Sequence, residues 1–544
     1  MLFNSPEFII FLLLVYCLYL VLSFRLQNYL LLFASYIFYG WWDTRFLFLI
    51  VLSTVVDFWV GLMMQNGRLT IQQRFIPALY LTILAVALLG LNPSGHWPFI
   101  DGHFELLRQL QSSAIDWVSA YAAGFLTLAY VAYMIIKTLD ERWRRKVCVT
   151  ISVTTQLGLL GFFKYFDFFI DSLHTGLASI GVQSATWHLD VVLPVGISFY
   201  TFQSLSYTID IYRRQTKPTN RFFDFALFVA YFPQLQAGPI ERARHLIPQL
   251  ANPRMLNLDQ TSRGLYLIVL GFLKKVGIAD GVAPSVDQIF NSSGRITWID
   301  VVAGGVFFAV QIYCDFSGYT DIARGVSKLL GIELMVNFNQ PYFATNPQDF
   351  WRRWHISLSS WLRDYLYVSL GGNRGSLRFI CRNLMLTMVI GGLWHGAAWN
   401  FVLWGFYQGS LLCLYRIWRE YRPQKSTAFE HPVFRLILIA TFFVIVCYGW
   451  LLFRAQSLAQ IASFTSLLFS DFGNLNYGAA TPRISSILGV SLLILMEIAQ
   501  YWVGDPHYYR RFVPPLRGFL IASMVAITMM GMSNEPTKFI YFQF

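Results

Sequence analysis

The stretch VFRLILIATFFVIVCYGWLLF, residues 433–453, decides the fold class of the chain. Its side chains are almost all apolar, and about 20 such residues form an α-helix that crosses the hydrocarbon core of a bilayer. Comparable runs recur along the chain, at EFIIFLLLVYCLYLVLSF (7–24), FIPALYLTILAVALLGL (75–91) and ISSILGVSLLILMEIAQYWV (484–503). Because backbone groups inside a bilayer must be hydrogen-bonded within the protein, these runs predict an all-α polytopic integral membrane protein.

The composition of the 544 residues agrees with repeated membrane spans, since 56% are hydrophobic, 17% aromatic and only 13% charged. We expect about 13 to 16 spans or half-spans. The polar connections are short, so the sequence predicts a single integral membrane domain over residues 1–544. Pro and Gly interrupt LPVGISFY (193–200) and PQLQAGPIE (233–241), which predicts re-entrant or broken helices at these two places.

The basic residues predict the orientation of the chain. The net charge is +12, and in a membrane protein excess Lys and Arg indicates cytoplasmic loops near anionic lipid rather than a nucleic-acid site. The clusters within 68–74, 141–146 and 213–221 are therefore expected in the cytoplasm, which places the N-terminus outside. The six cysteines show no metal-type spacing, and no metal site is expected.

One histidine, His395, lies inside the apolar and aromatic stretch GGLWHGAAWNFVLWGF (391–406). An ionisable side chain within a span is costly and usually faces a bundle interior or a wet cavity, which favours a functional role. The alternative is a neutral imidazole that only hydrogen-bonds neighbouring helices. Gly391, Gly392 and Gly396 would permit close helix packing or close approach of a ligand.

A second histidine, His355, lies in DFWRRWHISLSSWLRDYLYVSLGGNR (349–374). On a helical projection one face of this stretch is apolar and the other polar, so we expect a helix at the membrane interface or along an internal funnel. The apolar face holds Trp351, Trp354, Leu358, Trp361 and Leu362. A plain interfacial anchor whose arginines bind lipid phosphate is the alternative.

Two such histidines are suited to acyl transfer. A neutral imidazole, with an ordinary pKa of about 6.5, can accept the proton of a hydroxyl whose oxygen attacks an acyl carbon. A thioester donor needs no metal, because its sulfur is already a good leaving group. The sequence has no HExxH, GxSxG or P-loop motif, which argues against zinc-dependent, serine-hydrolase and ATPase chemistry. Acyl transfer and membrane transport stay open as function classes.

DFWRRWHISLSSWLRDYLYVSLGGNRG, followed by LTMVIGGLWHGAAWNFVLWGFYQG, resembles the paired signatures of the membrane-bound O-acyltransferase (MBOAT) family. The resemblance is to the bacterial branch that includes alginate O-acetylation membrane proteins and teichoic acid D-alanyl transferases. Further similar segments run in family order over almost the whole chain: QNYLLLFASYIFYGWW (27–42), GFFKYFDFF (161–169), LPVGISFYTFQSLSYTIDIYR (193–213), YFPQLQAGPIER (231–242), QIYCDFSGYTDIARG (311–325), NFNQPYFATNPQDFWRRWHISLS (337–359) and KFIYFQF at the end.

The resemblance implies an MBOAT-type helical bundle around a central tunnel, with re-entrant or interfacial helices. The family's invariant histidine corresponds to His395, which is expected to be the general base or an acyl relay. The second position, His or Asn in the family, corresponds to His355, which is expected to orient the donor or stabilise developing charge. Weaker candidates for the tunnel and donor site are Asp315, Ser317, Asp321, Arg352, Arg353, Trp354 and Trp394.

The weaker candidates also have interpretations that involve no role in the tunnel or the donor site. Asp315, Ser317 and Asp321 would serve equally well as hydrogen-bonding groups between helices. Arg352 and Arg353 could hold the phosphates of coenzyme A or of a carrier's phosphopantetheine, or could contact lipid phosphate.

The expected function is transfer of an acyl group, in the first instance acetyl, from a cytoplasmic thioester across the bacterial inner membrane to an exported polysaccharide. The donor would be acetyl-CoA or an acyl-carrier protein, and no permanently bound cofactor is expected. The resemblance implies a separate periplasmic SGNH-type transferase as partner. A transporter or channel, or a non-catalytic scaffold of an export system, is the alternative.

The chain departs from close relatives in one place. Residues 66–146 are expected to contain an insertion that supplies two extra spans and an external loop. This departure leaves the acceptor polysaccharide open, whether alginate or another polymer.

Overall fold

The computed structural model describes residues 1–90, 113–182, 188–189, 191–236, 238–292, 294–421, 431–472, 474–533 and 539–540. Within these residues all regular structure is helical, and nine helices are long and apolar enough to cross a membrane. They are Thr44–Asn66, Ile71–Leu89, Ile115–Ile136, Glu141–Ser179, Trp298–Leu329, Leu377–His395, Pro432–Arg454, Ile484–Val503 and Pro514–Gly531. The predicted all-α multi-pass membrane fold is confirmed, and the larger number of spans and half-spans stays a prediction.

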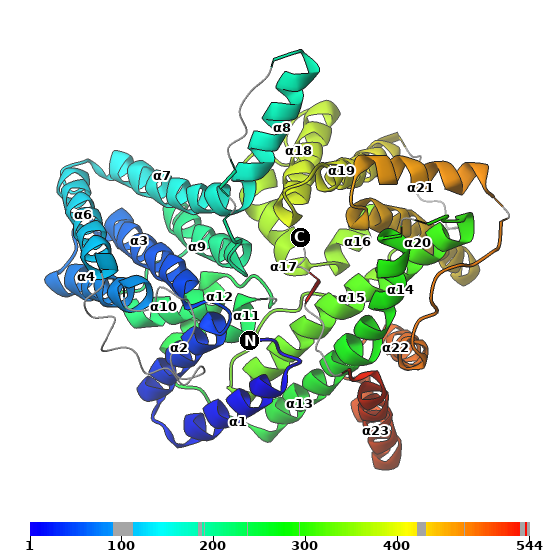
Figure 1. Ribbon diagram of the computed structural model, residues 1–544. Coiled ribbons are helices and arrows are strands. Elements are labelled where there is room, and N and C mark those ends of the chain that lie inside the picture. The colour runs from blue at the N-terminus through cyan, green and yellow to red at the C-terminus, as the bar shows by residue number, and fades with distance from the viewer. Residues whose placement is uncertain are drawn as a thin grey trace. The chain divides into compact units, whose positions relative to one another are not determined.

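The helices form two compact units (Figure 1). The first unit contains residues 1, 3–260 and 327–334. Its helices are α1 (Pro6–Val21), α2 (Phe24–Gly40), η1 (Thr44–Phe46), α3 (Leu47–Asn66), α4 (Ile71–Ala85), η2 (Val86–Gly90), α6 (Ser113–Ile136), α7 (Glu141–Leu160), η3 (Gly161–Tyr165), α8 (Phe166–Ser179), α9 (Ile197–Tyr212), α10 (Phe222–Ala230), α11 (Phe232–Leu235) and α12 (Ala243–Ala251).

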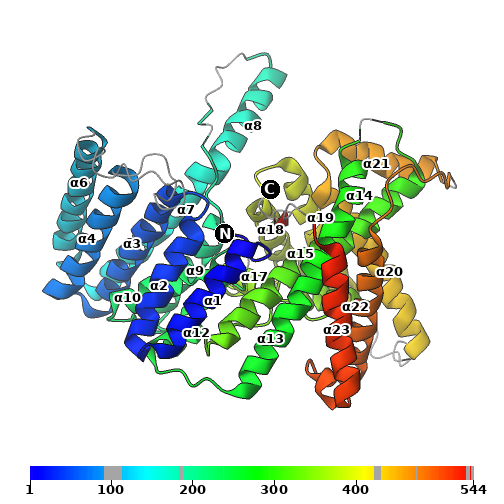
Figure 2. The ribbon, with the colours of Figure 1, turned by 60° about the horizontal axis from the view of Figure 1, so that its bottom comes forward.

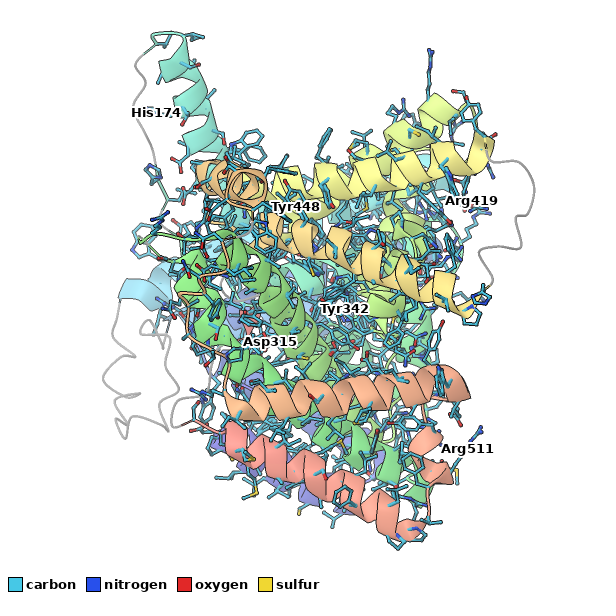
Figure 3. The ribbon with its side chains drawn as sticks, turned by 90° about the vertical axis from the view of Figure 1, so that its right-hand side faces the viewer. His174, Asp315, Tyr342, Arg419, Tyr448 and Arg511 are labelled. Atoms are coloured by element: carbon cyan, nitrogen blue, oxygen red, sulfur yellow. The ribbon has the colours of Figure 1, made fainter. Side chains whose placement is uncertain are left out.

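The second unit contains residues 2, 261–326 and 335–544, so the boundary falls within α13 and α15. Its helices are α13 (Leu258–Phe272), η4 (Leu273–Ala279), α14 (Asp280–Phe290), α15 (Trp298–Leu329), η5 (Pro341–Phe343), α16 (Pro347–Arg353), α17 (Ile356–Trp361), η6 (Leu362–Tyr367), α18 (Leu377–His395), α19 (Trp399–Tyr421), α20 (Pro432–Arg454), α21 (Leu458–Ser470), α22 (Ile484–Val503), η8 (Tyr508–Arg511) and α23 (Pro514–Gly531). Helices α22 and α23 run side by side (Figures 2 and 3).

Both interrupted segments of the first unit are present as predicted. Gly196 has φ 73° and precedes α9, while Gln236 follows the four-residue helix α11. A Cβ on Gly196 would lie 2.6 Å from the Leu235 carbonyl oxygen, so the two breaks pack against each other. Glycine is required here both for the left-handed backbone and for this close approach.

In the second unit α18 and α19 form a tight helical hairpin. A Cβ on Gly392 would lie 2.3 Å from the Phe401 carbonyl oxygen, and a Cβ on Gly405 would lie 2.4 Å from the Met388 carbonyl oxygen. The two backbones therefore approach through glycines, as membrane helices do when small residues line their interface. This packing fixes the end of α18, where His395 lies.

Helices α4 and α6 fall within the range 66–146 that the sequence predicts to contain an insertion. The external loop expected between them lies outside the described residues. The single-domain organisation and the insertion both stay predictions.

Candidate active site

His355 lies at a break between two short helices of the second unit. Helix α16 ends at Arg353 and α17 begins at Ile356, while His355 has φ 41° and ψ 56°. The expectation of one continuous helix through this stretch was therefore wrong. A left-handed backbone at a residue other than glycine costs about 1–3 kcal/mol and persists only where neighbouring structure enforces it.

The extended segment around Asn337 enforces the break. The Ile356 N–H donates to the Asn337 carbonyl oxygen and the Asn339 N–H donates to the Arg353 carbonyl oxygen, both at 2.9 Å. These two backbone bonds hold the chain on either side of His355. Such a constraint comes from residues that precede the helix, so a helical projection of the stretch alone could not show it.

The side chain of Asn337 fixes the tautomer of His355. Asn337 is fully buried, and its Oδ1 accepts hydrogen bonds from the Ser357 N–H at 3.1 Å and the Ser357 hydroxyl at 2.9 Å. His355 Nδ1 lies 3.1 Å from the same Oδ1. Because the backbone N–H identifies this atom as the amide oxygen, which can only accept, Nδ1 must carry the proton. Nε2 of a neutral His355 then has a lone pair.

That lone pair has no hydrogen-bond partner among the described residues, although Nε2 is buried. His355 lies outside the nine spanning helices and is 0% exposed. Burial lowers the pKa of His355 to about 3, so the imidazole is neutral at physiological pH. The structure thus contains a neutral imidazole with a fixed tautomer and an available acceptor nitrogen.

Aromatic rings enclose both histidines. The His355 ring meets Phe316 edge to face at a centroid distance of 4.6 Å and lies 6.2 Å from Trp394. His395, which is 5% exposed at the end of α18, lies 5.0 Å from Trp394. Both imidazoles therefore lie next to the same indole, although His355 precedes α17 and His395 ends α18.

Further rings complete the enclosure of His395. Its centroid lies 5.1 Å from that of Trp404 and 5.4 Å from that of Phe453. A Cβ on Gly396 would lie 2.1 Å from the Phe401 ring. Of the two uses expected for the glycines near His395, the structure shows close packing at Gly392 and Gly396. The indole and phenyl walls exclude water, which strengthens electrostatic interactions at the imidazole.

The predicted carboxylates Asp315 and Asp321 are held in buried ion pairs. Lys275 Nζ lies 2.6 Å from Asp315 Oδ1, and Lys274 Nζ lies 2.8 Å from Asp321 Oδ2. Figure 3 labels Asp315 between the helices of this unit. These contacts match the helix-to-helix alternative, and a tunnel-lining role stays a prediction. Ser317, on the same helix, is 1% exposed.

The lysines of these pairs were not among the residues predicted from the sequence. Lys274 and Lys275 lie in the π-helical turn η4, and Lys275 also lies 2.8 Å from Asp280. The signal was available, since two adjacent lysines within the apolar run GFLKKVGIAD are costly unless they are paired. Asp280 lies in the same run, whereas Asp315 and Asp321 lie far along the chain and could not be assigned from spacing.

The chain segment near the C-terminus also reaches the site. The Ile540 N–H donates to Asp315 Oδ2 at 2.7 Å, and the Phe539 ring lies 5.6 Å from the Phe316 ring. Phe316 in turn contacts His355. Residues 539 and 540 thus pack behind Phe316, the aromatic residue that contacts His355.

The two candidate arginines differ in their surroundings. Arg353 Nε lies 2.9 Å from Asp349 Oδ1, so its charge is already compensated on α16. Arg352 is exposed and forms no ion pair or hydrogen bond within the described part of the chain. Trp354, 1% exposed, packs against Trp450 at 4.7 Å and anchors the break. No cluster of three potential metal-ligating His, Cys, Asp or Glu occurs among the described residues.

Residues 216–459, which include both histidines, match the family model of the membrane-bound O-acyltransferases. A probable alginate O-acetylase of Azotobacter vinelandii is 37% identical over 520 residues, which cover 95% of this chain and 87% of the relative. The chain belongs to the membrane-bound O-acyltransferase family. Two other relatives are the peptidoglycan O-acetyltransferase of Helicobacter pylori, 37% identical over 355 residues, and the teichoic acid D-alanyltransferase of Bacillus subtilis, 30% identical over 278 residues.

The similarity to the Helicobacter protein covers 60% of this chain and 66% of that protein. The similarity to the Bacillus protein covers 48% of this chain and 69% of that protein. As a member of the family, this protein is a multi-pass membrane enzyme that transfers an acyl group to an oxygen. The predicted family and the enzyme class are therefore confirmed.

Proposed function

We propose that this membrane-bound O-acyltransferase moves an acetyl group from a cytoplasmic thioester to a hydroxyl of an exported polysaccharide. The observation that carries the proposal is the pair of buried imidazoles on one indole, His355 and His395 on Trp394. Acetyl is favoured over larger groups because two of the relatives are named for O-acetylation. The same relatives support a polysaccharide acceptor, alginate-like or other.

His395 is assigned as the general base. Its imidazole takes the hydroxyl proton as the hydroxyl oxygen attacks the thioester carbonyl carbon. The carbon–sulfur bond then breaks, and the departing sulfur takes the proton from the imidazolium, leaving an ester and a free thiol. Alternatively, His395 first accepts the acyl group from the thioester and then passes it to the hydroxyl.

His355 is assigned as the residue that orients the reacting groups. Its unprotonated Nε2 can accept a hydrogen bond from a hydroxyl or from water, but it cannot donate one to a developing oxyanion. Its low pKa makes it a weaker base than an ordinary imidazole. Orientation is therefore better supported than stabilisation of negative charge.

Arg352 is the better placed of the two arginines to meet the phosphates of the donor, because it is exposed and its charge is uncompensated within the described residues. Guanidinium groups bind phosphate strongly through paired N–H donors. Asp315 and Asp321 are assigned to holding the helices, through Lys275 and Lys274.

The orientation of the chain follows the basic loops. We place the donor side in the cytoplasm, the N-terminus outside and the protein in the bacterial inner membrane. An external SGNH-type transferase would receive the acyl group and complete its transfer to the polymer.

The experiment is reconstitution of the full chain in proteoliposomes with acetyl-CoA that carries a labelled acetyl group. The expected result is labelled ester on an oligosaccharide acceptor, or on an added external transferase, together with stoichiometric free thiol. Thiol release with the label recovered only as free acetate, or transport of an ion with no labelled ester, would contradict the proposal.

A further inference from the structure

The first unit contains an apolar cavity of about 670 Å³ that is lined by residues of α3, α4, α6 and α7. Figures 1 and 2 show these four helices as neighbours in the first unit. Its size lies within the range of roughly 300–1,000 Å³ that is typical of ligand sites. Apolar and aromatic side chains make up almost the whole lining, including Trp59, Phe75 and Phe125. Such a lining suits an alkyl chain and offers little to a polar substrate.

The cavity is accessible from the surface of α6. Leu128 and Tyr130 line it, yet they are 71% and 54% exposed. Helix α6, and α4 together with η2, are long and apolar enough to span the membrane, and only 6% and 22% of their most apolar stretches are buried. A molecule dissolved in the bilayer can therefore enter between these helices without crossing water.

Two cations converge at one end of the cavity. The Arg74 guanidinium carbon lies 5.2 Å from the centroid of the Tyr133 ring, and Lys137 Nζ lies 5.8 Å from the same centroid. Arg74 and Tyr133 both line the cavity. Neither cation forms an ion pair with the described residues, and Arg74 Nε is buried there without a hydrogen-bond partner. Two uncompensated cations at one ring favour the binding of an anion beside them.

Two arginines near the start of α7 are already hydrogen-bonded within the fold. Arg144 Nε donates to the Met63 carbonyl oxygen at 3.1 Å, and Arg145 donates to the carbonyl oxygens of Met64 and Ile211 at 3.2 and 2.6 Å. Residues 66–74 and 137–146 carry seven Lys or Arg against two acids, Asp140 and Glu141. Both acidic side chains already have partners, since Asp140 caps α7 and Glu141 forms an ion pair with Arg214.

We propose that this cavity binds an anionic phospholipid, with one acyl chain inside the cavity and the phosphate between Arg74 and Lys137. An apolar lining that ends at two uncompensated cations is complementary to a molecule with an alkyl chain and a negative head. The same end of the helices carries the basic loops that face the cytoplasm in the orientation proposed above, where the leaflet is anionic. Helices α4 and α6 lie in the predicted insertion, so the insertion gains a role in binding lipid.

The test uses the full chain purified in detergent, stripped of lipid and titrated with dioleoyl phosphatidylglycerol, with retention of one lipid followed by native mass spectrometry. Arg74→Gln and Lys137→Gln should each weaken binding about fivefold, since a cation near a phosphate contributes about a factor of five. Ala129→Trp, which fills the cavity, should abolish the retained lipid. Phosphatidylcholine should bind more weakly than phosphatidylglycerol, and inorganic phosphate should not displace the lipid.

Two matched variants serve as controls. Arg68→Gln removes an exposed cation just before α4, and Ala123→Trp adds the same bulk to an exposed position of α6 that does not line the cavity. Both should retain lipid as the wild type does. Wild-type retention by Ala129→Trp with unchanged melting temperature would overturn the cavity assignment. Equal retention by the double variant Arg74→Gln/Lys137→Gln would overturn the phosphate assignment.

Discussion

Replacement of Asn337 by Ala tests how the imidazole of His355 is positioned. The Asn337 side chain accepts from the Ser357 N–H, the Ser357 hydroxyl and His355 Nδ1 in a fully buried place. With about 1 kcal/mol for each hydrogen bond, the free energy of unfolding should fall by about 3 kcal/mol. Loss of the fixed tautomer should lower kcat by about 10- to 100-fold, which corresponds to 1.4–2.7 kcal/mol in the activation barrier.

The assay is acetyl transfer from labelled acetyl-CoA in proteoliposomes, measured from pH 5 to 9. Asn337→Asp keeps an acceptor for all three bonds and adds a negative charge, which raises the pKa of His355. It should recover part of the activity, and the acidic limb of its pH profile should move to higher pH. Such a shift separates positioning from a general loss of structure.

Asn339→Ala is the matched control. Asn339 is exposed two residues further along the same segment, and its hydrogen bonds are made by its backbone. This variant should have wild-type kcat and the wild-type pH profile. Acetyl transfer at the wild-type rate in Asn337→Ala, or an unchanged pH profile in Asn337→Asp, would refute this role of Asn337.

Three further predictions concern stability. Lys275→Met leaves Asp315 buried without its cation and should lower the free energy of unfolding by about 3–5 kcal/mol, with partial recovery in Lys275→Met/Asp315→Leu, as chemical denaturation would show. Gly392→Leu should abolish accumulation of folded protein, because its Cβ alone would clash with the Phe401 carbonyl oxygen; size-exclusion chromatography in detergent checks this. Because the pKa of His355 is about 3 in the fold and about 6.5 when unfolded, the unfolded chain gains a proton first on acidification, so stability should fall by about 2 kcal/mol between pH 7 and pH 5. His355→Asn should remove this share of the acid sensitivity in thermal melts compared with the wild type.

The membrane fold could be read from the sequence because the bilayer leaves few alternatives. Runs such as 433–453 can only be helices, and Pro and Gly at 193–200 and 233–241 had to interrupt them. Both interruptions are present in the structure. His395 could be found because an ionisable side chain in an apolar run is rare, and its aromatic neighbours were already visible in the sequence.

The geometry around His355 could not be read in this way. A positive φ at a histidine depends on Asn337 and Asn339, which lie outside the amphipathic stretch and act through backbone hydrogen bonds. The periodicity of that stretch therefore favoured a continuous helix. The pairs Lys274–Asp321 and Lys275–Asp315 likewise depend on how α15 packs against η4, which local spacing does not encode.

We assign His395 as the base and His355 as the residue that orients the reacting groups. This assignment is tested most directly by the rate of a single turnover of labelled acetyl-CoA in His395→Ala and His355→Ala, each with its melting temperature measured in the same preparation. We expect a loss of at least about 100-fold in His395→Ala, as for removal of a general base, and a smaller but clear loss in His355→Ala. Wild-type turnover in a folded His395→Ala protein would contradict this assignment.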